Sequence, residues 1–217
     1  PAEPCDDATF IRRASLDISG TLPDPLEAQA FVEDSDPGKR ARLIDRLLVS
    51  PGYAEFWALK WADLLRVEEK TLDAKGVETF HNWIRESLAV GKPLDVFARE
   101  VLSSTGSTYG NPPTNFYRAL RVPVDRAEAT AQVFLGSRLK CARCHDHPFE
   151  DVRQDDYYRF AALFDGIDYE IIENKRKDGF DKHQFRGEQK VKLVALDKLD
   201  PKKILKHPRT KKPPQPG

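Results

Sequence analysis

Apolar residues recur at helical spacing through the first three-quarters of the chain. Asp caps, Pro at first helical positions and Gly after last turns divide this pattern into separate helices. Short helices are predicted after Asp6 or Asp7, after Asp24-Pro25 and after Asp36-Pro37, and longer ones over Tyr53–Leu65, Glu78–Val90, Leu94–Leu102, Asp125–Leu135 and Asp155–Phe164. In the Tyr53–Leu65 helix, one apolar stripe is expected to face the core, formed by Trp57, Trp61, Leu64 and Leu65.

The character of the sequence changes near residue 167. Ile167–Ile172 and Val191–Leu196 alternate well enough to pair as strands. The predicted fold is mostly α, a single helical domain over residues 1–199 with a small β-hairpin near the C-terminus. Residues 200–217 are rich in Lys and Pro and are expected to be a linker to a missing C-terminal domain. Ser103–Thr114 is expected to be a long loop, of the kind that often carries function.

Charge and hydropathy narrow the range of partners. Thirty-five Lys and Arg residues balance 35 Asp and Glu residues, whereas a dedicated nucleic-acid binder normally carries a basic excess. No apolar run approaches the roughly 20 residues that a membrane-spanning helix needs. The chain contains no Met, even at its first position, which indicates a processed or excised piece of a longer protein.

The strongest chemical signal is Cys141-Ala142-Arg143-Cys144-His145, which fits C-x-x-C-H, the signature for covalent attachment of a c-type haem. Two thiols three residues apart on one helical turn can reach the two vinyl groups on one edge of the porphyrin. His145 is then directed at the iron from the same face. Because such thiols are handled after export, the motif predicts an exported domain of the periplasm or cell envelope.

Other uses of the two cysteines stay open. A redox dithiol normally lies beside a βαβ unit, whereas the flanks here are helical. Zinc could use Cys141, Cys144, His145 and His147, although structural zinc sites usually take their ligands in two separated pairs. An unmodified structural motif is the remaining alternative.

The opposite face of the iron has no obvious ligand, because the absence of Met excludes His/Met ligation. His147 is too close to His145 to reach that face, so it is expected to form hydrogen bonds that shape the chain after the motif. His81 borders the apolar stripe of its helix and is the best candidate, although such a histidine is more often a core or boundary residue. His183 and His207 are expected at the surface. Without a second His, the iron is five-coordinate or takes Lys, Tyr or water.

Residues around the motif could serve the cofactor. The cationic side chains of Arg138, Lys140 and Arg143 could pair with haem propionates. Such side chains are more usually only solvated surface charges. The expected apolar wall is formed by Phe134, Leu135, Phe149, Tyr157, Tyr158, Phe160 and Phe164. An acidic cluster follows the motif, formed by Asp146, Glu150, Asp151, Asp155 and Asp156. Calcium binding is conceivable, but capping of the helix at Asp155 explains part of the cluster more simply.

Several segments resemble a cytochrome-c-like domain of unknown function found in planctomycetes, family 1549 of the domains of unknown function. They include Asp6-Asp7-x-x-Phe10-x-Arg12-Arg13, Lys39-Arg40-x-Arg42-Leu43, Asn111-Pro112-Pro113-x-Asn115-Phe116-Tyr117 and the highly specific block from Cys141 to Phe149. The resemblance implies c-type haem on Cys141, Cys144 and His145, within a large exported protein, but it identifies no reaction. It does not imply the standard cytochrome c fold, whose motif lies near the N-terminus. Cys5 departs from the family pattern.

The sequence thus predicts an exported monohaem c-type cytochrome domain that relays electrons within a larger multidomain protein. Its expected cofactor is one covalent haem c, and its expected partners are the other domains of that protein and an electron donor or acceptor. One alternative is an open-faced haem enzyme that acts on peroxide or another small oxidant. The other is a binding or scaffold module whose motif is bare or holds zinc.

Overall fold

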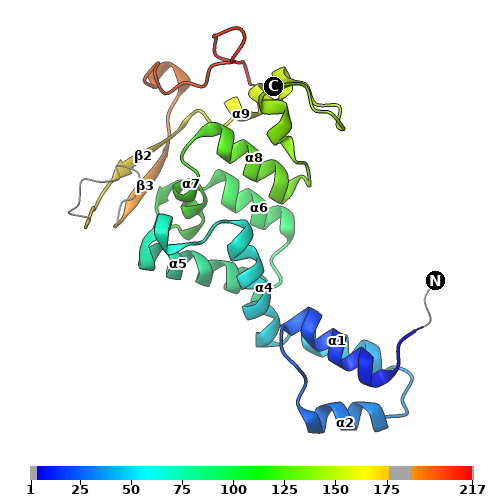
Figure 1. Ribbon diagram of the computed structural model, residues 1–217. Coiled ribbons are helices and arrows are strands. Elements are labelled where there is room, and N and C mark those ends of the chain that lie inside the picture. Colours follow the sequence, from blue (N-terminus) through cyan, green and yellow to red (C-terminus); the bar gives the residue numbers. More distant parts are fainter. Residues whose placement is uncertain (1–3, 176–186, 217) are drawn as a thin grey trace. The chain divides into compact units, whose positions relative to one another are not determined.

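The structure, a computed structural model, describes residues 4–175 and 187–216. Helices dominate, as the sequence predicts, and a small antiparallel sheet lies in the C-terminal half (Figure 1). The chain divides into two compact units. Pro1–Ala62 and His81–Pro93 form the first unit, and Asp63–Phe80 and Leu94–Gly217 form the second.

The first unit begins with three short helices: α1 (Asp7–Ser19), α2 (Pro25–Glu33) and α3 (Lys39–Leu48). The carboxylates of Asp6 and Asp24 cap α1 and α2 by accepting backbone N–H groups at 2.7 and 2.8 Å. The helices share a small core around Ile11, Phe31 and Leu43. The predicted caps of α1 and α2 are therefore confirmed, whereas α3 begins two residues after the predicted Asp36-Pro37 signal, with Gly38 at its N-cap and no side-chain cap.

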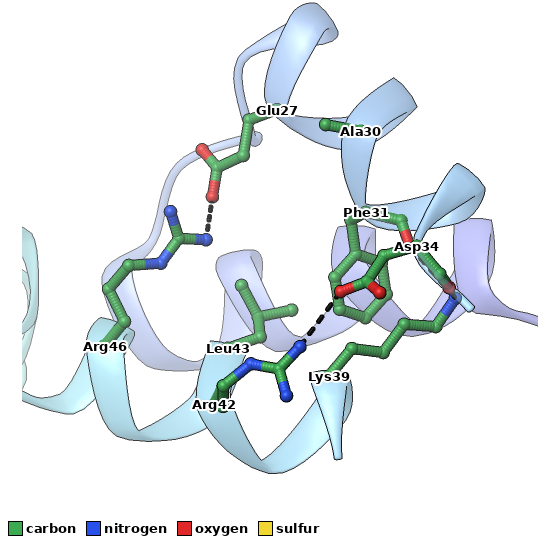
Figure 2. A pocket seen from close by; sticks show the side chains of 8 residues that line it. All are labelled: Glu27, Ala30, Phe31, Asp34, Lys39, Arg42, Leu43 and Arg46. Carbon is green, nitrogen blue, oxygen red and sulfur yellow. Dashed lines mark hydrogen bonds and ion pairs between the residues drawn. The ribbon is translucent and has the colours of Figure 1, made fainter. Parts of the chain in front are cut away.

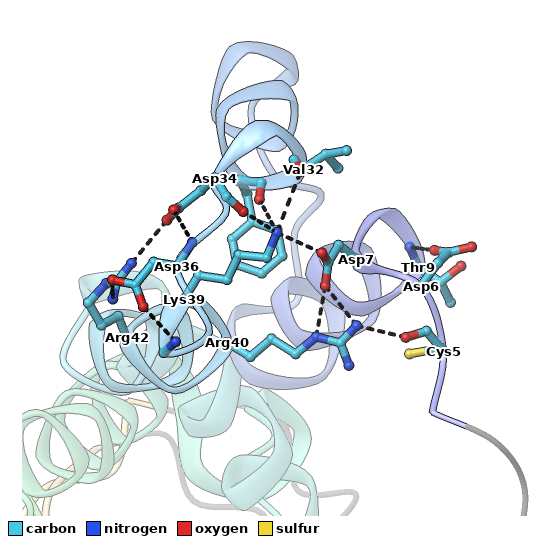
Figure 3. Close-up of polar contacts among 12 residues, drawn as sticks. Cys5, Asp6, Asp7, Thr9, Val32, Asp34, Asp36, Lys39, Arg40 and Arg42 are labelled. Carbon is cyan, nitrogen blue, oxygen red and sulfur yellow. Dashed lines mark hydrogen bonds and ion pairs between the residues drawn. The ribbon is translucent and has the colours of Figure 1, made fainter.

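Lys39 ties the three helices together (Figure 3). Its ammonium group donates to the carbonyl oxygens of Phe31 and Asp34, at the C-terminus of α2, over 3.0 and 2.6 Å. The same group lies 2.6 Å from the Asp7 carboxylate in the first turn of α1. A cation at a helix C-terminus and an anion at a helix N-terminus both complement the helix dipoles, so this contact stabilises α1 and α2 and links them to the start of α3.

A pocket opens between α2 and α3 beside Lys39 (Figure 2). Across it, Glu27 pairs with Arg46, and Asp34 pairs with Arg42 at 3.0 Å. Because each cation in its lining pairs with a carboxylate, the pocket presents little net charge to a ligand.

Helix α4 (Pro51–Leu64) begins at the predicted Ser50-Pro51 signal but buries a different face. Trp57 is 37% exposed and Leu64 is 50% exposed, so the predicted stripe is wrong at these two positions, whereas Trp61 is half-buried and Leu65 is buried. The buried positions of the helix carry small side chains, namely Ala54, Ala58 and Ala62. Apolar spacing marks both faces of this helix, and spacing alone does not show which of them packs.

The second unit contains the N-terminal half of α5 (Glu69–Ala89), α6 (Leu94–Ser103), α7 (Asn115–Ala119), α8 (Pro123–Phe134) and α9 (Gln154–Ala162). Helix α5 starts well before the predicted Glu78, and Asp73 breaks it with a φ of 57°. The short helix α7 follows the Pro-rich loop and was not predicted. Large buried side chains of the unit include Phe80, Phe97, Val101, Phe116, Tyr117 and Leu120.

The predicted hairpin is present as β2 (Ile167–Ile171) and β3 (Gln189–Leu193). A third strand, β1 (Gly106–Ser107), lies within the expected loop and pairs with the other edge of β3, giving the order β1-β3-β2. All pairs are antiparallel. Two residues are too few to show an alternating pattern, which is why the sequence did not reveal β1.

Candidate haem-attachment site

The C-x-x-C-H motif lies in the second unit, between α8 and α9. Its first residues form the 3-10 helix η2 (Leu139–Arg143), held by the buried side chains of Leu139 and Ala142. Cys141 and Cys144 are exposed and free, and the Cys144 N–H donates to the Cys141 carbonyl at 3.3 Å. Side chains three residues apart in a 3-10 turn lie on the same side. The predicted single turn is therefore present, in its tighter form, and it brings both thiols to one side.

His145 presents one ring nitrogen for coordination. Its side chain is exposed, and Nδ1 lies 2.7 Å from the carbonyl oxygen of Asp146. Because a carbonyl only accepts hydrogen bonds, Nδ1 carries the proton and Nε2 keeps its lone pair. Metal-binding histidines typically have this arrangement, in which the N–H of one nitrogen donates to an oxygen and the other nitrogen binds the metal.

His147 has the opposite tautomer, and both of its ring nitrogens are engaged. Nε2 donates to the carbonyl of Arg138 at 3.1 Å, and Nδ1 accepts the N–H groups of Phe149 and Glu150 at 3.3 and 2.9 Å. Its backbone N–H donates to the Val152 carbonyl at 2.8 Å. The predicted hydrogen-bonding role of His147 is confirmed, since it closes the loop that follows the motif.

Residues in the first half of α9 form hydrogen bonds with the motif. The Gln154 side chain donates to the carbonyl of Arg143 at 3.0 Å, and its backbone N–H donates to the Asp146 carboxylate at 2.9 Å. The Tyr158 hydroxyl donates to the same Arg143 carbonyl at 3.3 Å. Two hydrogen bonds thus hold the Arg143 carbonyl just before Cys144, and a third holds the side chain of Asp146 just after the motif.

A carboxylate from α8 lies beside the motif. Glu128 accepts a hydrogen bond from the Tyr157 hydroxyl at 2.7 Å and lies 3.8 Å from the guanidinium of Arg143. Burial and the neighbouring Glu128 raise the pKa of Tyr157 well above its usual range, so the Tyr157 hydroxyl keeps its proton and donates a hydrogen bond to Glu128 at any physiological pH. Sequence reasoning missed Glu128 because nothing in its helical spacing distinguishes it from a surface residue. Arg138 and Arg143 are exposed, and their pairing with propionates stays a prediction.

The expected apolar wall is only partly in the core. Tyr157, Tyr158 and Phe164 are buried, and Phe134 and Phe160 are half-buried. Phe149, by contrast, is 93% exposed, and Leu135 is 62% exposed. An aromatic ring with so much exposed surface, five residues after Cys144, is available to contact an attached group.

The expectation for His207 is wrong, because this side chain is buried, with 5% of its surface exposed. Its ring packs edge-on against Tyr158, with 4.9 Å between ring centroids, and Nε2 lies 3.0 Å from the Asp155 carboxylate. The surrounding Lys and Pro residues suggested a solvated segment, and no local pattern indicated the contact with α9. His183 lies outside the described residues.

His81, the possible second iron ligand, and Cys5, the cysteine outside the motif, both belong to the first unit. The Nε2 atom of His81 is buried and forms no hydrogen bond within the part of the chain that the structure describes. His81 ligation of the iron stays a prediction, since the motif belongs to the second unit. Cys5 is half-buried with a free thiol, and its carbonyl accepts a hydrogen bond from Arg40 at 2.7 Å.

The acidic cluster after the motif has structural roles. Asp146 accepts from Gln154, and Asp156 accepts the backbone N–H of Arg153 at 3.0 Å, which caps α9. Over residues 4–175 and 187–216, no three His, Cys, Asp or Glu side chains converge as metal ligands. No helix in these same ranges combines the length and apolar character needed to span a bilayer.

Fold and motif together define a mainly α-helical protein with one C-x-x-C-H site. Comparison with known families matches residues 1–169 to the model of a protein of unknown function (DUF1549, PSCyt2). The chain belongs to this family, which confirms the resemblance seen in its motifs. No curated protein and no solved structure matches the chain.

Proposed function

We propose that this chain is an exported monohaem c-type cytochrome domain that relays electrons within a larger multidomain protein. The observation that carries the proposal is the arrangement of Cys141, Cys144 and His145. Both thiols are free, exposed and on one side of a 3-10 turn, and the adjacent imidazole keeps its Nε2 lone pair. These three groups fit one covalent haem c, which would supply a one-electron iron couple when bound.

The chain's own residues would orient this site. Gln154 and Tyr158 hold the backbone of Arg143, and His147 closes the following loop. The Asp146 carbonyl keeps the proton of His145 on Nδ1. A rigid ligand loop lowers the structural change that accompanies electron transfer, which suits a relay better than a site that must rearrange.

The experiment that tests the proposal is maturation in a bacterial host that exports the chain and carries haem-attachment machinery. We expect a coloured product whose intact mass exceeds that of the polypeptide by one haem. A Cys141→Ala, Cys144→Ala double variant should stay colourless, and Cys5→Ser, the matched control, should load normally. A parent chain that stays at its polypeptide mass would overturn the proposal.

The spectrum of the loaded ferric protein separates the relay from the open-faced enzyme. A six-coordinate, low-spin spectrum is expected of a relay. A high-spin spectrum that shifts on addition of cyanide or peroxide would instead support the enzyme. Zinc retained by the unloaded protein after dialysis, and lost in Cys141→Ala, would support the binding-module alternative.

A further inference from the structure

The C-terminal segment carries a concentrated positive charge. Residues 200–217 include six Lys and Arg side chains and one Asp, while the first 199 residues carry 29 Lys and Arg against 34 Asp and Glu. The chain is neutral as a whole because a net positive C-terminal segment, residues 200–217, offsets a net negative charge on residues 1–199. This segment lies beside α9 in the second unit (Figure 1).

Within this segment, residues 207–212 form a closed turn, here named the basic loop. The His207 N–H donates to the Lys212 carbonyl at 3.0 Å, and the Lys211 N–H donates to the His207 carbonyl at 2.9 Å. Inside the turn, Nδ1 of His207 accepts the N–H groups of Arg209 and Thr210 at 3.3 and 3.5 Å. The side chains of Arg209, Lys211 and Lys212 are exposed.

Lys211 has a φ of 59°, a conformation that residues with a Cβ adopt at an energetic cost. Strained backbone positions persist where the surrounding structure fixes them, and they cluster at functional sites. The closed turn supplies that fixation here. Its three cations are therefore held in one arrangement rather than spread along a flexible tail.

The basic loop is also fastened to the body of the unit. The His207 ring, buried at its centre, packs on Tyr158 and lies 3.0 Å from Asp155. Just before the loop, the Leu205 N–H donates to the Asp165 carboxylate at 3.2 Å. Lys203, earlier in the segment, also lies 3.2 Å from the Asp168 carboxylate, so contacts at several points attach the segment to the unit.

One side chain connects this loop to the candidate site. Tyr158 packs against His207 on one side, and its hydroxyl donates to the carbonyl of Arg143, between the two cysteines, at 3.3 Å. The basic loop thus lies one aromatic residue away from the C-x-x-C-H turn.

We propose that the basic loop is a docking surface for the acidic face of an electron-transfer protein. This inference rests on the proposed function, because it assigns the partner of that site. A localised cationic surface steers a partner of opposite charge into a defined orientation. A protein with a discrete acidic patch fits the basic loop better than a nucleic acid or an anionic membrane does. The extended negative charge of those two would also be repelled by the net negative charge of residues 1–199.

The first test measures binding without haem, using the purified full chain and immobilised polyglutamate. We expect salt-sensitive binding that weakens roughly tenfold when Arg209, Lys211 and Lys212 are all changed to Glu. A matched control changes three exposed cations elsewhere, Arg12, Arg13 and Lys70, to Glu and should bind as the parent does. If both triple variants lose binding equally, general charge and not this loop is responsible, and the proposal fails.

A second variant tests whether the built shape of the loop matters. His207→Ala keeps every cation but removes the anchor, so we expect several-fold weaker polyglutamate binding with normal folding by circular dichroism. Unchanged binding in His207→Ala would overturn the proposal. So would a DNA duplex or an anionic phospholipid vesicle that binds the parent more tightly than polyglutamate does.

The haem-loaded chain provides a separate measurement. Charge reversal of the loop should slow oxidation of the ferrous protein by the anionic complex ferricyanide at low ionic strength and speed its oxidation by a cationic cobalt phenanthroline complex. Equal rates in parent and variant would contradict docking near the haem. If the chain never takes up haem, the polyglutamate measurement still decides whether the loop binds acidic polypeptides, so the two failures are distinguishable.

Discussion

The carboxylate of Asp73 lies 3.1 Å from the guanidinium of Arg118, whose side chain has no exposed surface. Asp73 also accepts hydrogen bonds from the Tyr109 hydroxyl at 2.8 Å and from the backbone N–H groups of Gly76 and Gly187 at 2.8 and 2.6 Å. One carboxylate therefore connects the kink of α5, the loop around β1, helix α7 and the start of β3. This explains why Asp73 keeps a φ of 57° in the middle of a helical segment.

We expect Asp73→Asn to lower the free energy of unfolding by about 3 kcal/mol, because it removes the negative charge that lies 3.1 Å from a fully buried guanidinium. Urea unfolding of the full chain at neutral pH measures this loss. The matched control is Asp95→Asn, whose exposed carboxylate lies 4.0 Å from Arg99, and it should cost less than about 0.5 kcal/mol. Equal losses would show that Asp73 acts as an ordinary surface residue.

The same residue predicts a dependence of stability on pH. Burial alone would raise the pKa of Asp73, but the hydrogen bonds from Gly76 and Tyr109 and the charge of Arg118 lower it below its ordinary value of 3.8. A depressed folded-state pKa stabilises the fold above the unfolded value, and this stabilisation disappears as pH falls through the folded value. Urea midpoints measured from neutral pH down through the acid range should fall more steeply below about pH 4 in the parent than in Asp73→Asn.

Local signals in the sequence predicted most helices because caps and apolar spacing act within a few residues. Asp6 and Asp24 cap the helices expected of them. Only the contact of Asp73 with the Gly76 N–H is local; its other three partners lie 36, 45 and 114 residues further along the chain, so its wider role could not be recognised in this way. Its role depends on tertiary contacts, as does the choice of buried face in α4.

In the first unit, we expect Lys39→Met to reduce stability by about 1–2 kcal/mol, because it removes a charge-assisted contact with Asp7 and the carbonyls that end α2. Only 11% of the Lys39 side chain is exposed. Hydrogen exchange of α1–α3 in the full chain would detect the loss where it occurs. Arg42→Met is the control, since its side chain is 56% exposed, and faster exchange in that variant than in Lys39→Met would contradict the assignment.

His147→Ala separates a positioning residue from an iron ligand. Removing three ring hydrogen bonds should reduce the yield of covalent haem several-fold, while the molecules that do load keep the parent spectrum. His147→Asn, which retains a donor and an acceptor, should recover part of the yield. His145→Ala is the matched comparison and should change the spectrum of the loaded protein. A spectral change of the same kind in His147→Ala would show that His147 binds the iron.

In the candidate site, too, residues set by local sequence spacing were predicted, and residues brought in by tertiary packing were not. The spacing of Cys141, Cys144 and His145 is local, so the sequence identified them directly. The hydrogen-bonding role of His147 was also foreseen, because its distance from His145 limits where it can reach. Glu128 and His207, in contrast, approach the motif only through the packing of α8 and of the C-terminal segment on α9.

The last prediction concerns the far side of the iron. A histidine that is only a core residue normally has hydrogen-bond partners for its buried nitrogens, yet the buried Nε2 of His81 has none within the described ranges 4–175 and 187–216. If His81 is the second ligand that the sequence suggests, His81→Ala should convert a low-spin loaded protein into a high-spin one without loss of covalent haem, as seen by absorption spectroscopy and intact mass. Added imidazole should restore the low-spin form, because it replaces the missing ligand. His207→Ala serves as the comparison: Nε2 of His207 also lacks a hydrogen-bond partner among the described residues but lies 3.0 Å from the Asp155 carboxylate, so this variant should keep the parent spectrum. A low-spin spectrum that survives in His81→Ala would exclude His81 and leave Lys or Tyr as the ligand to be tested.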